Sequence, residues 1–187
     1  ARLVDARAHL LPADGEARGE PVLRAPWLSE GYYNEPQKGA ELWEGGWMHT
    51  GDVATLDAFG VIDIRDRIKD VIKTGGEWVS SLALEDLVSR HPAVREVAVV
   101  GIADPQWGER PFALLVLRDG HVIGARELKE HLKPFVELGH LSKWAIPSQI
   151  AVVTEIPKTS VGKLDKKRIR IDIVEWQANN STFLSTL

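Results

Sequence analysis

The pattern of hydrophobic and polar positions changes character near residue 66. Before that point, apolar residues come in short runs, and the runs Leu3–Ala6, Pro21–Ala25 and Val61–Arg65 predict short strands. The connections between them carry turn signals, namely Asp14-Gly15, Asn34-Glu35-Pro36, Gly45-Gly46 and Phe59-Gly60. The first 65 residues are therefore expected to be β-rich, with few core residues of their own.

A hairpin and a helix are predicted directly after the change. Two short apolar segments, Val71–Lys73 and Trp78–Val79, flank the pair Gly75-Gly76, which is typical of a tight β-hairpin turn. Ser80 or Ser81 can then cap a helix that ends at His91-Pro92. Its apolar positions, which fall on one helical face, are Leu84, Leu87 and Val88.

Longer apolar runs and a second helical pattern follow. Val97–Ile102 and Phe112–Leu117 are continuously apolar, which is typical of strands buried on both faces. Leu128 and Leu132 place a helix near residues 125–133, which Pro134 is expected to stop or kink. The remaining expected elements are a strand at Ile150–Val153, a helix from Asp165 to about Glu175, and a frayed tail from Asn179.

This order of elements predicts an α+β fold. Residues 71–187 are expected to form a small mixed sheet with flanking helices, and residues 1–65 a separate β-rich part. The segment between them, residues 66–70, is highly charged and is expected to be a junction without core residues.

Composition and charge narrow the possible partners. The chain has 187 residues, 44% of them hydrophobic and 27% charged, as in globular proteins. Its net charge of −4, with both signs interspersed, argues against nucleic-acid binding. One basic run near the end could attract phosphates or simply be a solvated helix face; it contains Lys163, Lys166, Lys167, Arg168 and Arg170.

Several classes of site are not expected. Cysteine is absent, which excludes disulfides and thiolate metal sites and fits a reducing, cytoplasmic location. The six histidines show no metal-binding spacing, so no metal site is predicted. No apolar run reaches the length of a membrane span.

Three local patterns can carry chemistry, although each also has an ordinary structural reading. In Thr50-Gly51-Asp52, a carboxylate after a glycine turn can accept hydrogen bonds from a ribose diol, or it can close an Asx-type turn. The charged junction before Gly75-Gly76 can be a hinge or a plain linker. In Pro157–Leu164, Lys163 can be a loop ammonium that stabilises phosphate charge, or a solvated surface lysine.

Taken together and in this order, the patterns resemble the carboxy-terminal signatures of the adenylate-forming (AMP-binding) superfamily, over about residues 19–170. The closest resemblance is to its fatty acyl-CoA synthetase branch, which carries a D-R-x-K-D junction and a G-G-E-W-[IV]-S-S hairpin. Asp66–Asp70 and Gly75–Ser81 match them here. The turn Asp104–Pro111 also looks like the family's strand-to-strand connection.

The resemblance implies two half-reactions. A carboxylate attacks the α-phosphate of ATP to give an acyl-adenylate, and the CoA thiol then converts the adenylate to a thioester. A mobile carboxy-terminal domain, here residues 71–187, rotates between the two reactions about a hinge at residues 66–70. Residues 1–65 are then the β-rich end of the large N-terminal adenylation domain. That large domain is the expected partner of the mobile domain.

The resemblance also implies roles for the first group of residues. Asp52 holds the ribose hydroxyls, and Arg67 assists at the ribose or phosphate. Lys69 is the hinge residue and also reaches towards the nucleotide. Many relatives carry Asp at the hinge position, so this chain departs from them there.

A second group of implied roles lies beyond the junction. Lys73 and Trp78 lie near the nucleotide, although many relatives carry Arg where Trp78 stands. The CoA tunnel is walled by the hairpin residues Gly75, Gly76 and Glu77. Lys163 stabilises the adenylation transition state, because such transfers depend on positioning and charge neutralisation.

The expected function is that of the carboxy-terminal part of a medium- or long-chain fatty acid–CoA ligase that uses ATP, Mg²⁺ and CoA. The family's ATP loop, adenine segment and magnesium glutamate lie upstream and are absent from the 187 residues, so this chain alone is expected to be inactive. Two alternatives stay open. One is another adenylate-forming enzyme, which loads a carrier protein or acts like a luciferase, and the other is an inactive binding module.

Overall fold

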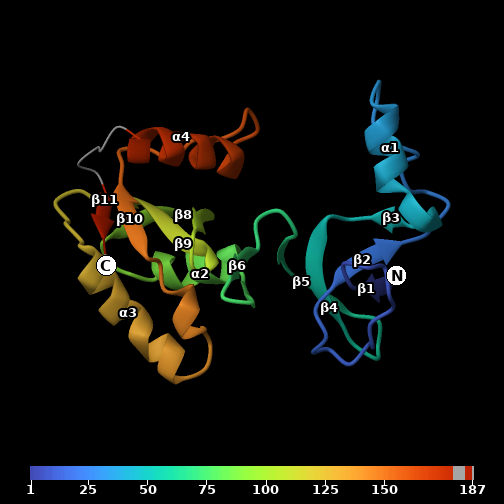
Figure 1. Ribbon diagram of the computed structural model, residues 1–187, viewed down its shortest axis with the longest axis horizontal. Coiled ribbons are helices and arrows are strands. Elements are labelled where there is room, and N and C mark those ends of the chain that lie inside the picture. The colour runs from blue at the N-terminus through green and yellow to red at the C-terminus, as the bar shows by residue number, and fades with distance from the viewer. Residues whose placement is uncertain (179–183, 187) are drawn as a thin grey trace. The chain divides into compact units, whose positions relative to one another are not determined.

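A computed structural model describes residues 1–178 and 184–186 of the chain. The chain divides into two compact units, Ala1–Lys69 and Asp70–Leu187. Both units appear in Figure 1.

The first unit is built from short antiparallel strands. Strands β1 (Arg2–Val4), β2 (Glu20–Leu23) and β3 (Met48–His49) form one sheet in that order. Strands β4 (Asp52–Leu56) and β5 (Ile62–Arg67) form a two-stranded ribbon. An isolated bridge between Gly19 and Ala54 joins ribbon and sheet. The small core consists of Leu3, Val4, Val22, Val53 and Ala54.

A short helix in this unit was not predicted. Helix α1 (Pro36–Leu42) and a 3₁₀ turn (Glu44–Gly46) precede β3. The helix begins with proline at its first position, a common helix start. It buries none of its residues, so it leaves no apolar periodicity in the sequence.

The charged junction is shorter than its sequence indicated. Asp66 and Arg67 are the last residues of β5, and the Asp66 side chain is almost fully buried. The expectation of a segment without core residues is therefore wrong for Asp66. Only Ile68–Asp70 form the turn that leads into the second unit.

The second unit contains a six-stranded mixed sheet. Its main path is β11-β10-β9-β6-β7, and β8 pairs with β9 alone. The contact of β9 with β10 is parallel, whereas β8–β9, β6–β7 and β10–β11 are antiparallel. The bounds are Ile72–Thr74 (β6), Glu77–Val79 (β7), Val94–Asp104 (β8), Gly108–Leu117 (β9), Gln149–Val152 (β10) and Leu184–Thr186 (β11).

Helices cover both faces of this sheet, as Figure 1 shows. Helices α2 (Ser81–Ser89) and α3 (Ala125–Glu137) pack on one face, with a 3₁₀ turn at Lys143–Ala145. Helix α4 (Lys166–Ala178) packs on the other face through Ile169 and Ile173. The predicted α+β architecture, with buried strands between helices, is confirmed.

Local signals for helix α2 are confirmed in detail. The Ser80 hydroxyl accepts a hydrogen bond from the Ala83 amide at 3.2 Å, as an N-cap does. The predicted face, Leu84, Leu87 and Val88, is buried. The helix ends at Ser89, just before His91-Pro92.

Two expectations about the second unit are wrong in part. Helix α3 continues through Pro134 to Glu137, because the lost amide costs one hydrogen bond near the helix end while Leu132, Phe135 and Val136 keep packing on the core. The expectation of a frayed tail from Asn179 falls in part on residues 179–183 and 187, which lie outside the described residues. However, Leu184–Thr186 form β11, which is paired with β10.

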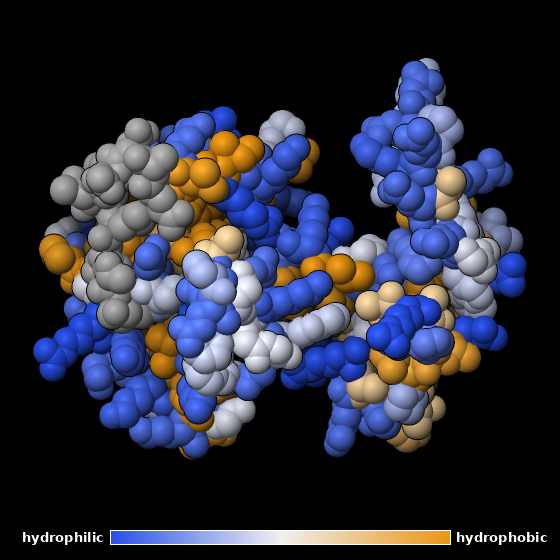
Figure 2. Space-filling model, in the orientation of Figure 1, coloured by the Kyte–Doolittle hydropathy of each residue, from blue (hydrophilic) through white to orange (hydrophobic). Residues whose placement is uncertain are grey.

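Apolar side chains also reach the surface of both units, between larger polar areas (Figure 2). The most exposed of them include Trp27, Tyr33, Phe59 and Val122. Within the part of the chain that the structure describes, every helix is too short or too polar to cross a membrane.

Candidate functional site

The Thr50-Gly51-Asp52 turn of the first unit is held by hydrogen bonds on both sides. The Thr50 hydroxyl donates to the Pro21 carbonyl at 2.9 Å, and the Gly51 amide donates to the Glu20 carboxylate at 2.8 Å. Gly51 has a positive φ of 69°, which favours glycine at this position. The turn therefore places Asp52 at the start of β4 in a defined orientation.

Asp52 and Arg67 meet across the β4–β5 ribbon. They are register partners, and Arg67 Nε lies 2.8 Å from Asp52 Oδ1. The Asp52 side chain is 17% exposed and that of Arg67 57% exposed. Two residues predicted separately as nucleotide ligands are thus brought together, with the guanidinium on the solvent side of the carboxylate.

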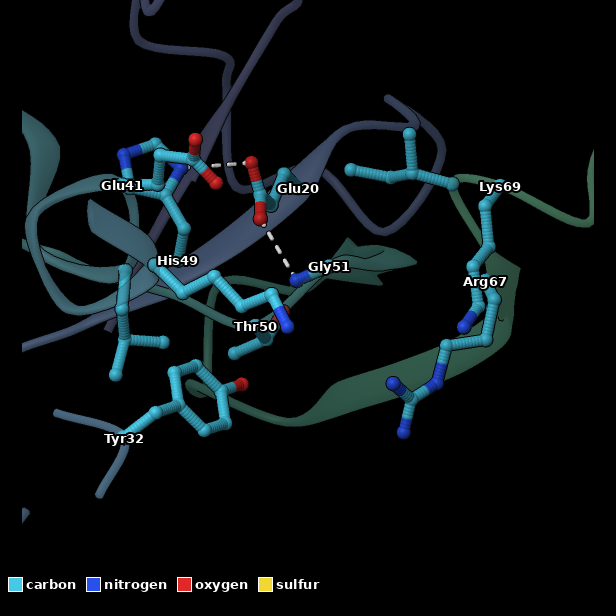
Figure 3. A pocket seen from close by; sticks show the side chains of 11 residues that line it. Glu20, Tyr32, Glu41, His49, Thr50, Gly51, Arg67 and Lys69 are labelled. Atoms are coloured by element: carbon cyan, nitrogen blue, oxygen red, sulfur yellow. Dashed lines mark hydrogen bonds and ion pairs between the residues drawn. The ribbon is translucent and has the colours of Figure 1, made fainter. Parts of the chain in front are cut away.

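Sequence reasoning missed the contribution of Glu20. Its carboxylate joins two elements, because Oε1 accepts from the Gly51 amide and Oε2 lies 2.8 Å from His49 Nδ1 (Figure 3). Glu20 stands 31 residues before Gly51, so no local pattern reveals this contact. The only available signal was an acidic residue at the start of a strand.

A pocket of about 400 Å³ lies beside this turn, within the first unit. Figure 3 shows the side chains around it, which include the predicted residues Arg67 and Lys69 but not Asp52. The other lining residues are Glu20, Tyr32, Lys38, Glu41, Leu42, His49, Thr50, Gly51 and Ile68. A ligand in this pocket would therefore meet charged groups of both signs and a largely apolar surface.

The glycine hairpin of the second unit has the predicted geometry. Gly75 and Gly76 both have positive φ, 57° and 85°, as a two-residue type I′ turn requires. The Gly75 amide donates to the Trp107 carbonyl at 2.9 Å, and a Cβ at Gly75 would lie 3.1 Å from the Trp107 ring. The turn is therefore pressed closely against Trp107.

The other predicted hairpin residues lie around this turn. Lys73 and Trp78 are cross-strand partners, and the Lys73 ammonium lies 5.7 Å from the centroid of the Trp78 ring. Lys73 is exposed, and Trp78 is 43% exposed. Glu77 accepts a hydrogen bond from the Ser142 hydroxyl, which ties the hairpin to the segment after α3.

Sequence reasoning also missed an aromatic pair beside the hairpin. The rings of Trp107 and Trp144 lie 4.6 Å apart, centroid to centroid, at an angle of 39°. The Lys143 ammonium lies 4.9 Å from the Trp144 ring centroid. Trp144 lies 37 residues after Trp107, so no local pattern reveals this contact.

Lys163 lies on a closed loop with its side chain exposed. The Thr159 amide donates to the Lys163 carbonyl at 2.7 Å, and the Lys163 amide donates to the Thr159 hydroxyl at 3.2 Å. Gly162, with φ of 80°, makes the reversal. Among the described residues, the Lys163 ammonium makes no hydrogen bond or ion pair.

The basic run around Lys163 is not a uniform cationic patch. Lys166 pairs with Glu85, Arg168 with Asp172 and Arg170 with Asp70, each within 2.9 Å. Lys163 and Lys167 are the members without such a described pair. The five cations therefore do not act together as one phosphate-attracting patch.

The predicted site residues fall into two groups. Asp52, Arg67 and Lys69 belong to the first unit, whereas Lys73, Gly75, Gly76, Glu77, Trp78 and Lys163 belong to the second. Within the described residues, no group of three or more histidine or acidic side chains is arranged to hold a metal ion.

Comparison with known proteins identifies similar sequences along both units. Residues 83–163 match the family described as the AMP-binding enzyme C-terminal domain. The chain is 44% identical over 170 residues to the long-chain-fatty-acid–CoA ligase of Thermus thermophilus, and 38% identical over 169 residues to the 3-methylmercaptopropionyl-CoA ligase of Ruegeria lacuscaerulensis. Each alignment covers 90% of this chain and 30% of the relative.

A solved structure shows the same arrangement of elements. The chain superimposes with a TM-score of 0.78 on o-succinylbenzoate CoA synthetase from Bacillus subtilis, in complex with its acyl-adenylate intermediate. The two are 28% identical, and the match covers 91% of this chain and 33% of that one. The chain thus spans about a third of the length of the proteins that it matches.

Proposed function

Because this chain belongs to the adenylate-forming superfamily, we propose that it is the carboxy-terminal portion of an ATP-dependent acyl-CoA ligase. The complete enzyme forms an acyl-adenylate from ATP and a carboxylic acid, and then transfers the acyl group to the thiol of CoA. The observation that carries this proposal is the exposed Lys163 ammonium, presented without a described partner on a loop closed by its own hydrogen bonds.

Asp52 and Arg67 serve the nucleotide in this proposal. An ionised carboxylate is an acceptor only, so Asp52 can bind both hydroxyls of a ribose. Arg67 Nε already bonds one carboxylate oxygen, which holds the carboxylate in place. The remaining guanidinium donors of Arg67 can bind phosphate oxygens, and the Lys69 ammonium lies at the edge of the same pocket.

Lys163 acts in the first half-reaction. When the carboxylate attacks the α-phosphate, charge builds up on the phosphoryl oxygens, and an ammonium within reach stabilises that charge more than it stabilises the ground state. A lysine paired inside its own domain could not do this without breaking the pair. The exposure of Lys163 supports the role.

The glycine hairpin acts in the second half-reaction. Gly75 and Gly76 have no side chains, so a narrow pantetheine arm can pass close to their backbone, and Glu77 lies beside them. Lys73 and Trp78 present a cation and an aromatic ring on the adjacent strands, where they can contact the nucleotide. The turn Ile68–Asp70, with Lys69 at its centre, is the hinge that alternates the two states.

The test separates the two half-reactions in the full-length enzyme. We expect Lys163→Ala to reduce acyl-adenylate formation, followed as pyrophosphate release, by about 100-fold or more, the loss typical of one charge-stabilising donor. Thioester formation from synthetic acyl-adenylate should stay close to wild type. The exposed neighbour Lys167→Ala is the matched control. Equal loss of both half-reactions would contradict the proposal.

The acid is proposed to be a medium- or long-chain fatty acid. The similarity to the Thermus long-chain-fatty-acid–CoA ligase supports this choice, and the Bacillus o-succinylbenzoate CoA synthetase represents an aromatic alternative. Assays of the full-length enzyme with octanoate, palmitate and benzoate would distinguish them. Preference for benzoate, or for a carrier protein over CoA, would contradict the fatty acyl assignment.

The isolated 187-residue chain is proposed to be inactive, because the ATP loop and magnesium ligand of the family are not among its residues. Mg²⁺ would be bound by the rest of the enzyme. Mixing the isolated chain with ATP, Mg²⁺, fatty acid and CoA should release no AMP, and AMP release would contradict this part of the proposal.

A further inference from the structure

A buried ion pair joins the two helical layers of the second unit around the edge of the sheet. Lys166 Nζ lies 2.9 Å from Glu85 Oε1 and donates to the Ser81 hydroxyl at 2.7 Å. The two charged side chains are 10% and 11% exposed. Glu85 and Ser81 belong to α2 on one face, whereas Lys166 begins α4 on the other face.

The same oxygen atom, Glu85 Oε1, also binds the backbone at the edge of the sheet. Among the described residues, strand β8 pairs only with β9, so its other side has no strand partner there. The Val99 amide on β8 donates to Glu85 Oε1 at 2.8 Å. Glu85 therefore binds the edge strand and the first residue of α4 with one oxygen atom.

The position of Lys166 in its helix is unfavourable without this contact. The first turn of a helix carries partial positive charge, and α4 has no acidic residue there. A buried cation at that point needs an anion, which Glu85 supplies from another helix. The pair therefore fixes the start of α4 at one place beside β8.

A second ion pair lies one turn further along the same helical face. Arg170, four residues after Lys166, binds Asp70 with a distance of 2.8 Å. Asp70 is the last residue of the turn that joins the two units. The apolar residues Ile169 and Ile173 lie between and beyond these cations on the same face.

Hydrophobic contacts and ion pairs hold helix α4 in different ways. Hydrophobic contacts hold the helix on the sheet, but they are not directional and allow it to slide or rotate. A hydrogen-bonded ion pair fixes direction and register. Lys163 precedes Lys166 by three residues, and the Asp165 amide donates to the Pro157 carbonyl at 2.9 Å, which links the loop to the helix start.

We propose that Lys166 and Arg170 are positioning residues that fix the Lys163 loop to the domain, Lys166 through α2 and the β8 edge, and Arg170 through Asp70 at the junction. Neither residue contacts the substrate. When the domain turns at the junction, the loop then moves with it as one body and Lys163 arrives at a defined place. This inference rests on the proposed function of Lys163.

The principal test is Lys166→Met in the full-length enzyme, which removes the charge and keeps the side-chain length. We expect kcat for acyl-adenylate formation to fall about tenfold or more, since a misplaced catalytic group loses orientation. The KM for ATP and thioester formation from synthetic acyl-adenylate should stay within about twofold of wild type, because the Lys166 ammonium is not proposed to contact either ligand. Lys166→Arg should restore most of kcat.

A second readout does not depend on activity. Hydrogen exchange of the amides in residues 157–170 should become faster in Lys166→Met, because the loop and the start of α4 lose their anchor. Lys167→Met, at the exposed neighbouring position, is the control and should leave both readouts unchanged. If Lys166→Met does not fold, Arg170→Met, whose ion pair is more exposed, replaces it with the same expectations.

The outcomes separate this inference from the proposed function. If hydrogen exchange in residues 157–170 is unchanged in Lys166→Met, the ion pair does not anchor the Lys163 loop. If Lys166→Met slows both half-reactions equally, the pair does not specifically position Lys163. A wild-type enzyme that makes no acyl-adenylate from ATP contradicts the proposed function instead. Even in that case, the hydrogen-exchange measurement tests whether the Lys166 ion pair anchors the Lys163 loop.

Discussion

Arg67 Nε lies 2.8 Å from Asp52 Oδ1 across the β4–β5 ribbon, so the last residue of one strand holds the first residue of the other. Each belongs to a different sequence signature, and the antiparallel register brings them together. The contact means that changing either residue also changes the other's environment.

Substitution of this pair is expected to affect both half-reactions, because a ribose-bound adenylate is present in each. In the full-length enzyme, Asp52→Asn should raise the KM for ATP about 10- to 100-fold, as the loss of charge-assisted hydrogen bonds does. Arg67→Met should have a smaller effect in the same direction. The control is Arg65→Met, since Arg65 pairs with Asp63 on the same strand. An unchanged KM in Asp52→Asn would contradict the ribose assignment.

The two hairpin glycines differ in the space around them. A methyl group at Gly75 would approach Trp107 to 3.1 Å, whereas one at Gly76 would meet nothing within 4 Å. Both positions have positive φ, so alanine costs about 1 kcal/mol at either from backbone strain. Gly75→Ala should therefore lower the free energy of unfolding, measured by chemical denaturation, more than Gly76→Ala does.

The same pair of variants tests the CoA assignment. Gly75→Ala and Gly76→Ala should both slow thioester formation from synthetic acyl-adenylate and leave acyl-adenylate formation near wild type, because an added methyl group narrows the path of the pantetheine arm. Retained thioester formation in both variants would argue against a CoA path at this hairpin.

Gly101 makes room for the carboxylate that supports the hairpin. Glu109 Oε2 accepts a hydrogen bond from the Lys73 amide at 2.9 Å, and a Cβ at Gly101 would lie 2.9 Å from that same oxygen. Gly101→Ala must displace the carboxylate, so we expect a loss of about 1–3 kcal/mol in unfolding free energy. Urea unfolding measures it, with Gly124→Ala in open space as control.

A double variant checks the cause of this loss. If the methyl group acts by displacing Glu109, then Gly101→Ala should cost little in a Glu109→Ala background, since the displaced group is gone. Full additivity of the two losses would show that Gly101 acts through other contacts, such as its close approach to Ile72.

His91 is expected to make stability depend on pH. Burial lowers the pKa of His91, and the nearby His131 and His121 lower it further, while Glu127 opposes them. Its Nδ1 accepts a hydrogen bond from the Ala93 amide at 3.2 Å, which requires that nitrogen to be unprotonated.

The direction of the pH effect follows from the lowered pKa. The unfolded chain binds the proton first as pH falls below the ordinary pKa of 6.5, so stability decreases from there towards the folded-state pKa. Urea midpoints between pH 8 and pH 5 should show this decrease, and His91→Leu should reduce it. His140→Leu at an exposed position is the control. An unaltered pH dependence in His91→Leu would exclude His91 as the source.

Most of the second unit's architecture could be predicted because its signals are local. The hairpin follows from Gly75-Gly76, the start of helix α2 from the Ser80 cap, and strand β9 from the continuous apolar run Phe112–Leu117. Each of these signals lies within a few neighbouring residues. Helix α1 has no buried face and could not be found in this way. Pro134 does not stop helix α3, because packing of neighbouring residues outweighs one lost hydrogen bond.

The sequence by itself determined most strands and helices of the second unit, the hairpin glycines and the candidate residues Asp52, Arg67 and Lys163, since periodicity, turn chemistry and motif spacing are properties of neighbouring residues. Only the tertiary structure decided which distant side chains meet. Glu20 reaches Gly51, Glu85 reaches Lys166, and Asp70 reaches Arg170 across 100 residues. Such contacts depend on strand register and helix packing in three dimensions, and a linear pattern carries no record of them.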